Sequence, residues 1–169
     1  MTPVRIREAA PEDAPGLIAL FETLYAETKS LLREPGEAVP PVEQYAERIV
    51  QGAAAGSEAW LVAERDGRLV GVCVGRRGSA SRNRHALFLV MGVLQAWWGR
   101  GVGRALLQAV EQWAVSHGIH RLELTVSVGN ARARSLYEKC GFEREGTRRD
   151  SLLIDGEYVD ELYMAKLLA

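Results

Sequence analysis

Three alternate glycines, Gly99, Gly101 and Gly103, constrain this chain more than any other feature. They lie between an apolar run, His85 to Leu94, and a segment from Val102 to Trp113 whose apolar residues recur at helical spacing. Glycine allows unusual backbone dihedral angles and close approach of a ligand. The first N–H groups of a helix have no internal partner, and the helix dipole is positive there. This arrangement therefore predicts a cradle for phosphate groups between a buried strand and a helix.

Two arginines, Arg100 and Arg104, add positive charge to the expected cradle. A P-loop is excluded because G-x-x-x-x-G-K-[ST] is absent. A dinucleotide fingerprint, G-x-G-x-x-G, fails in both registers, since its last glycine is replaced by Arg104 in one and by Leu106 in the other. From these residues alone, a tight turn that binds no ligand stays open as the alternative.

The flanking segments alternate between strand and helix patterns. Asp66-Gly67 between two apolar runs is a strong hairpin signal. The run His85 to Leu94 shows little alternation, so we expect it to be buried on both faces. The proline-containing segment Thr28 to Pro41 is expected to be a loop within one domain. Mixed order of this kind predicts an α/β or α+β fold with one central sheet. Strands are expected at 4–7, 59–64, 68–75, 85–94, 121–128, 142–153 and 157–168, and helices at 11–27, 42–52, from 102 to a stop at Gly118, and 130–141.

Composition narrows the class of protein. The chain has 169 residues, 47% of them apolar, enough for about one domain with its own core. Lys and Arg number 21 and Asp and Glu 22, a net charge of −1 that argues against a nucleic-acid partner. The longest uncharged stretch, 15 residues from His85 to Gly99, is shorter than the ~18–20 of a membrane span, so no membrane partner is expected. Two distant cysteines, Cys73 and Cys140, and no apolar leader favour a cytoplasmic location.

A second block completes a recognisable pattern. Trp98 to Gly103 resembles the acetyl-CoA signature [QR]-x-x-G-x-[GA] of the GNAT N-acetyltransferase superfamily, and Asn130 to Phe142 is similar to its N-x-x-A-x-x-x-Y-x-x-x-G-F block. The resemblance covers the whole chain and is strongest from Arg84 to Ala165, with bacterial L-amino-acid and ribosomal-protein N-terminal acetyltransferases most alike. It implies a single N-acetyltransferase domain over residues 1–169. The implied fold is a GNAT-like mixed sheet of about seven strands flanked by about four helices.

The resemblance also implies an enzyme, an acyltransferase that takes acetyl-CoA as co-substrate and passes its acetyl group directly to a primary amine. Trp98 departs from the Gln or Arg of the family pattern. Since the family's pyrophosphate contacts are mostly backbone N–H groups, the cradle is expected to survive this change. The residues that the resemblance assigns to acetyl-CoA are Met91, Gly92, Val93, Trp98, Gly99, Arg100, Gly101, Val102, Gly103, Arg104 and Asn130.

Tyr137 is the expected catalytic residue, because the family's equivalent tyrosine lies near the thioester sulfur and helps the thiolate to leave. A general base is not specified. Thr125 occupies the position where some relatives place a glutamate, which leaves Glu123, His85 or water as alternatives. No metal site is expected.

The acceptor is expected to be the amine of a small molecule, an amino acid or similar compound. Two alternatives stay open: a protein N-terminus or lysine as acceptor, and a non-catalytic acyl-CoA-binding domain. The substrate walls of this fold are expected to come from the segment Thr28 to Pro41 and the final hairpin. The family also includes dimers, so a homodimer is compatible with the resemblance.

Overall fold

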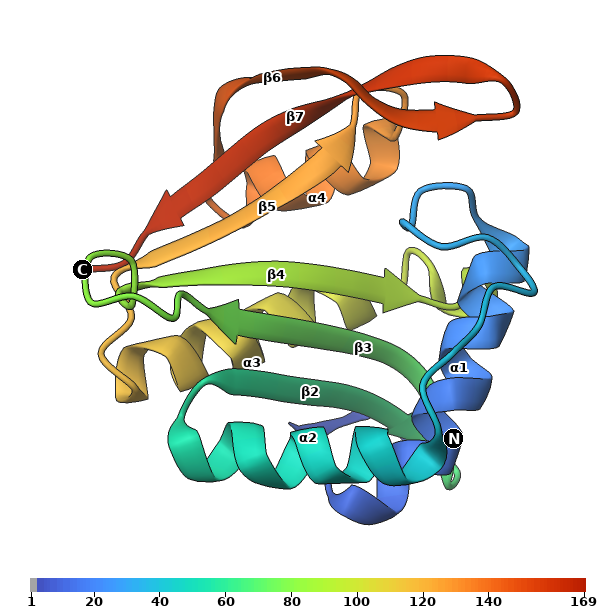
Figure 1. Cartoon of the computed structure of the whole chain (residues 1–169), viewed down its shortest axis with the longest axis vertical. Coiled ribbons are helices and arrows are strands. Elements are labelled where there is room, and N and C mark those ends of the chain that lie inside the picture. The colour runs from blue at the N-terminus through green and yellow to red at the C-terminus, as the bar shows by residue number, and fades with distance from the viewer. Residues whose placement is uncertain (1–2) are drawn as a thin grey trace.

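A seven-stranded sheet runs through the structure, with helices on both of its faces (Figure 1). The computed structural model describes residues 3–169. The strand order is β1-β2-β3-β4-β5-β7-β6, and every neighbouring pair is antiparallel except β4 and β5. The strands are β1 Arg5–Glu8, β2 Glu58–Arg65, β3 Arg68–Arg77, β4 Ala86–Val93, β5 Arg121–Ser127, β6 Glu143–Ile154 and β7 Glu157–Leu167. The helices are α1 Ala14–Glu27, α2 Val42–Ala55, α3 Val102–Ser116 and α4 Ala131–Lys139, with 3-10 turns at Pro11–Asp13 and Gln95–Trp97. The GNAT-like mixed sheet of about seven strands and four helices is confirmed.

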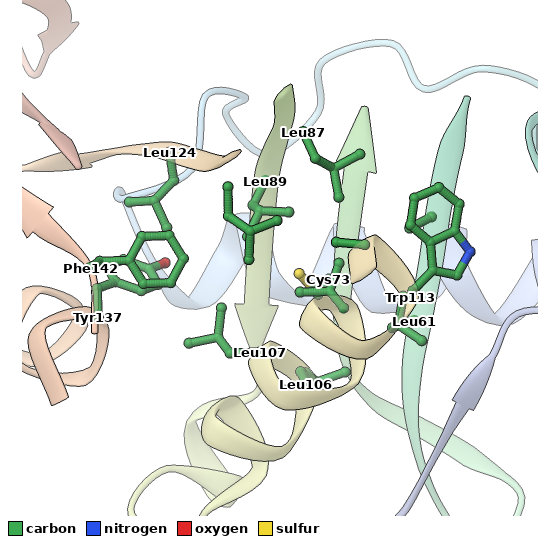
Figure 2. Close-up of a cluster of buried hydrophobic side chains, with 14 of the residues drawn as sticks. Leu61, Cys73, Leu87, Leu89, Leu106, Leu107, Trp113, Leu124, Tyr137 and Phe142 are labelled. Atoms are coloured by element: carbon green, nitrogen blue, oxygen red, sulfur yellow. The ribbon is translucent and has the colours of Figure 1, made fainter. Parts of the chain in front are cut away.

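The larger core lies between the sheet and α3 with α4. Val102, Leu106, Val110 and Trp113 recur on one side of α3, and all four are buried. They pack against side chains that alternate inward along β4 and β5, as Figure 2 shows for Leu87, Leu89 and Leu124. Burial of each large apolar side chain stabilises the fold by about 1.5–3 kcal/mol. This core fixes the start of α3 relative to the sheet.

A second core lies on the opposite face, where α1 and α2 cover β2 and β3. Leu17, Leu20 and Leu24 of α1 meet Val72 and Val74 of β3 there. α1 begins after a 3-10 turn in which the Asp13 carboxylate accepts from the Ala10 backbone N–H. This cover stops at β3 and the last residues of β4.

One expectation about β4 was wrong. The run was predicted to be buried on both faces, but Phe88 is 37% and Val90 42% exposed. The reason is that α1 reaches β4 only near Gly92, where an added Cβ would lie 2.7 Å from a Leu24 methyl. Beyond that contact no helix within residues 3–169 covers this face of β4, which leaves an open floor of apolar side chains.

The segment from Thr28 to Pro41 has no helix or strand, as predicted. Lys29 in this segment forms an ion pair with Asp155 at the tip of the β6–β7 hairpin. The loop and the hairpin tip therefore meet, and Figure 1 shows both at the end of the molecule to which β4 points. In the described part of the chain, no helix is long and apolar enough to cross a bilayer.

Candidate functional site

The site begins where β4 and β5 separate. Their parallel pairing covers three residue pairs, which join Ala86, Leu87 and Phe88 to β5. Beyond Phe88, β4 pairs only with β3, while β5 continues along β7 as far as Ser127. The facing edges of the two strands thus lack a strand partner from there to their ends, and backbone groups on them are available to an extended ligand.

The glycine turn that is expected to bind phosphate groups lies at the open end of β4. Gly99 and Gly101 both have left-handed backbones, with φ of 71° and 79°. A Cβ at either position would meet nothing within 4 Å, so both face open space. Gly103 differs, because a Cβ there would lie 2.9 Å from a Leu136 methyl. Two glycines therefore shape the turn before α3, and the third lets α3 approach α4.

The positive groups expected at the cradle are arranged around it. α3 begins at Val102, which is buried and anchors the first turn of the helix. The Arg100 guanidinium lies 5.1 Å from the centroid of the Trp97 ring. Arg104 is exposed on the first turn of α3. The dipole of α3 and the two arginines therefore give this corner a positive field.

Trp98 makes contacts that the sequence does not indicate. Its indole Nε1 donates to the carbonyl oxygen of Val93 at 2.7 Å. The Arg132 guanidinium lies 4.3 Å from the centroid of its ring. The indole thus connects the end of β4 to α4 across the mouth of the gap between β4 and β5.

The remaining residues expected at the acetyl-CoA site lie on the last part of β4 and at the start of α4. Met91 and Val93 lie against Gly103 of α3, with side-chain carbons 3.6 and 4.0 Å from the position of a Cβ there. Gly92 faces α1 on the other side of β4. The Asn130 side chain accepts from the Ala133 backbone N–H at 3.2 Å and caps α4. Its side-chain amide nitrogen is left available as a donor.

Tyr137 lies on α4 and is 7% exposed. Its ring centroid is 5.8 Å from that of Phe142, and Figure 2 shows the two rings packed together below Leu124. Burial raises the pKa of Tyr137 above its usual value of 10, and the nearby Cys73 and Cys140 thiols act in the same direction. The hydroxyl therefore stays protonated at neutral pH and is available to donate a hydrogen bond.

The two side chains considered as general bases lie at the closed end of the gap. Glu123 is in register with Phe88, and it accepts from Arg121 Nε at 2.7 Å. The carbonyl of His85 accepts from the backbone N–H groups of His120 and Arg121. Both candidates therefore lie where β4 and β5 are still paired, whereas Tyr137 belongs to α4 beyond β5.

Two buried polar residues were not predicted from the sequence. Ser127 and Glu161 are each only 8% exposed. The alternation of β7, in which Leu162 and Met164 point into the larger core, places Glu161 on the other face. That pattern alone predicts that Glu161 is exposed to solvent, so no signal in the sequence indicates that it is buried. Among residues 3–169, no group of three His, Cys, Asp or Glu side chains is placed to hold a metal ion.

Comparison with known proteins decides the family. The family model described as "Acetyltransferase (GNAT) family" matches residues 21–142. The chain belongs to the GNAT acetyltransferase family. As a member of it, the chain is an N-acetyltransferase that uses acetyl-CoA.

Several GNAT relatives have known activities or structures. The L-amino acid N-acetyltransferase AaaT of Escherichia coli K12 is 39% identical over 111 residues, which is 63% of this chain and 67% of that protein. The ribosomal protein uS5 alanine N-acetyltransferase of the same organism is 35% identical over 82 residues, 48% of this chain but only 42% of that protein. The crystal structure of a GNAT acetyltransferase from Streptococcus pneumoniae superposes with a TM-score of 0.94 at 28% identity, covering 99% of this chain and 100% of that one.

Proposed function

We propose that this GNAT enzyme transfers the acetyl group of acetyl-CoA to the primary amine of a small molecule, an amino acid or a close analogue. We infer a small acceptor from the volume of the cavity between the Thr28–Pro41 loop and the hairpin tip, which is about 280 Å³. Its lining includes Tyr25, Leu31 and Leu152, and an exposed ion pair between Lys29 and Asp155 joins the loop to the hairpin tip at its edge. Small-molecule pockets start at about 300 Å³, so this partly open cavity suits a ligand as small as an amino acid. The similarity to an L-amino acid N-acetyltransferase supports the same class.

The donor side of the proposal rests on the open gap. The N–H groups at Gly99 to Gly103 would bind the pyrophosphate, together with Arg100 and Arg104. The edge of β4 at Met91 to Val93 and the Asn130 amide would hold the pantetheine arm. Trp98 is part of the same wall. The sheet runs from residue 5 to residue 167, which supports one acetyltransferase domain for the whole chain.

The transfer itself needs few groups. The amine nitrogen attacks the thioester carbon, the C–S bond breaks, and its electron pair goes to sulfur. The protonated hydroxyl of Tyr137 donates a hydrogen bond to the developing thiolate. The proton lost by the nitrogen passes to water, because Glu123 and His85 lie at the closed end of the gap.

A protein N-terminus is the second candidate acceptor. Similarity to the ribosomal protein uS5 alanine N-acetyltransferase favours it. The open apolar floor of Phe88, Val90 and Tyr163 offers a surface that a peptide would cover. We rank it second because the tied loop and hairpin narrow the approach.

The test is release of free CoA thiol from acetyl-CoA with a panel of the twenty L-amino acids, their amides and peptides with free N-termini. Turnover with amino acids, with an acetylated product of matching mass, supports the proposal. Turnover with peptides alone favours the second candidate. Release with neither, in protein that binds acetyl-CoA, refutes both.

A further inference from the structure

The cavity between the loop and the hairpin tip adjoins the end of β4. Tyr25 in the last turn of α1 and Thr28 just after the helix both lie on its lining. Between them, Glu27 Oε2 accepts from the Gln95 backbone N–H at 2.8 Å, and the Gln95 side chain donates to the Glu27 carbonyl oxygen at 2.9 Å. Gln95 begins the 3-10 turn that leads from β4 toward the glycine turn. One wall of the cavity is therefore fixed beside the segment that is proposed to hold acetyl-CoA.

The lining includes a half-buried cation, Arg33, that has no anionic partner in residues 3–169. Its one hydrogen bond in that part of the chain runs from Nη1 to the carbonyl oxygen of Ala38. Lys29 on the same lining differs, because it is paired with Asp155. A guanidinium carries five N–H donors in a planar fork that matches a carboxylate. The remaining donors of Arg33 are therefore available to an anionic group of a ligand.

The Tyr25 hydroxyl is a second donor on the lining, and it lies within the electrostatic influence of Arg33. Burial raises the pKa of Tyr25 above its usual value of 10, and the charge of Glu37 acts in the same direction, while that of Arg33 opposes it. The hydroxyl therefore stays protonated at neutral pH. Stacking on Phe21, with ring centroids 5.9 Å apart, holds the ring. A guanidinium and a hydroxyl on the lining of one cavity can donate to the two oxygens of a carboxylate.

Much of the remaining lining is apolar. Leu31, Leu152 and Ile154 belong to it, and all three are half-buried. Leu31 also packs against the second core, under α1. Glu34 is the other charged residue of the lining without an ion pair in residues 3–169, but it is exposed, so solvent screens its charge more than that of Arg33. An apolar group of a ligand gains by burial against these leucines, whereas a charged group loses solvation.

We propose that this cavity binds an α-amino acid with an apolar side chain, its carboxylate paired with Arg33 and Tyr25 and its side chain against Leu31 and Leu152. This inference rests on the proposed function and narrows its acceptor class. The amino group is left for the side of the cavity that adjoins β4. An amino acid amide or a protein N-terminus has no carboxylate beside its amine and would leave Arg33 without a partner.

The first experiment compares KM for the best apolar L-amino acid of the panel and for its amide. Arg33→Met should raise KM by about tenfold for the acid and by less than about twofold for the amide, because only the acid loses a charged hydrogen bond. Arg33→Lys keeps the charge without the fork and should raise KM for the acid less than Arg33→Met does. Tyr25→Phe keeps the stacking on Phe21 and should raise KM for the acid by about threefold to tenfold.

KM for acetyl-CoA should stay unchanged in all three variants. The matched control is Arg82→Met, at an exposed arginine of the loop between β3 and β4, which should change neither KM. Arg33→Met also removes the bond to Ala38, and a disturbed loop would raise KM for acid and amide alike. Equal rises for the two compounds, or an unchanged KM for the acid, would overturn the inference.

The panel of acceptors tests the apolar part of the lining. The value of kcat/KM should be highest for L-amino acids with apolar side chains, such as leucine and methionine. It should be at least about tenfold lower for aspartate and lysine, since a charged side chain loses solvation in the cavity. A panel in which charged amino acids are the best acceptors would overturn the inference.

Direct binding separates this inference from the proposed function. Leucine and its amide are titrated calorimetrically into protein saturated with CoA. If the wild type releases no CoA thiol with any amine yet binds leucine, and Arg33→Met abolishes that heat, the proposed function fails while the inferred site stands. If the wild type acetylates small amines but uses amides as well as acids, the proposed function stands and the inference is overturned.

Discussion

The two halves of the sheet differ in how helices cover their faces. β1 to β4 have α3 on one face and α1 with α2 on most of the other, whereas β5, β7 and β6 have helices on one face only. Val74 and Val90 mark where the cover ends at the edge of the first half, because they are register partners on the same face of β3 and β4, yet Val74 is 5% and Val90 42% exposed. The covered half gains stability from burial. The open half keeps polar and apolar groups free for a ligand, which we take as the division between scaffold and site.

The largest expected effect lies at the junction of the halves, in Tyr137→Phe. Phenylalanine fills the same space beside Phe142, so folding and acetyl-CoA binding should barely change. The transition state loses a hydrogen bond to the thiolate, worth about 2.7–4 kcal/mol, or about 10²–10³ in kcat. The measurement is CoA release with the best acceptor found, under conditions where chemistry limits the rate. Unchanged turnover would make Tyr137 part of the scaffold.

Gly101→Asp should separate folding from ligand binding. The new side chain points into open space but brings a negative charge to the helix N-terminus, at a backbone with φ of 79° that favours glycine. We expect loss of the stabilisation by acetyl-CoA, about 2.7 kcal/mol at a hundredfold excess over the wild-type Kd. Thermal unfolding with and without acetyl-CoA measures it. Gly67→Asp, at another exposed left-handed glycine, is the control and should keep the ligand-induced shift.

The paired valines test the comparison itself. Val74→Ala should lower the free energy of unfolding by about 2 kcal/mol, since two buried methyl groups are lost and a cavity is left. Val90→Ala should cost less than about 0.5 kcal/mol, because the side chain is already exposed. Denaturant unfolding of both variants measures the difference. Equal losses would mean that both faces of β4 contribute to the scaffold.

Two arginine clusters extend the comparison to charge. Arg7 forms an ion pair with Asp13 in the covered half, and Arg121 forms one with Glu145 in the open half. The hydrogen bond from Arg7 lowers the pKa of Asp13 below its usual 3.8, and the bond from Arg121 lowers that of Glu145 below 4.5. The Asp13 side chain is 14% exposed and that of Glu145 45%, so solvent screens the second pair more.

We therefore expect Asp13→Asn to destabilise the fold by about 1–2 kcal/mol at pH 7, and Glu145→Gln by less than about 0.5 kcal/mol. A carboxylate with a lowered folded pKa stabilises the fold above its unfolded pKa and loses that effect as the pH falls through the folded value. The penalty of Asp13→Asn should thus shrink as the pH falls below 3.8. Urea unfolding across this range measures it, and a penalty independent of pH would contradict the charge argument.

Much of this arrangement was predictable from the sequence. Hydrophobic periodicity and turn residues give the order of strands and helices, and the glycines at 99 and 101 predict the turn before α3 because their backbone freedom is needed there. The exposure of Val90 was not predictable, since it depends on where α1 ends in space. The contact of Trp98 with Arg132 and the burial of Glu161 beside Ser127 share that cause, because each joins segments more than thirty residues apart that local patterns do not bring together.

The three residue pairs that join β4 to β5 have a consequence for how such a chain changes over generations. Few ladder bonds pass from one half to the other, so a substitution in the 28–41 loop or at the hairpin tip alters the acceptor wall while the register of β1 to β4 is untouched. We therefore expect single substitutions in the proposed acceptor wall to change the acceptor amine while the protein stays folded and still binds acetyl-CoA.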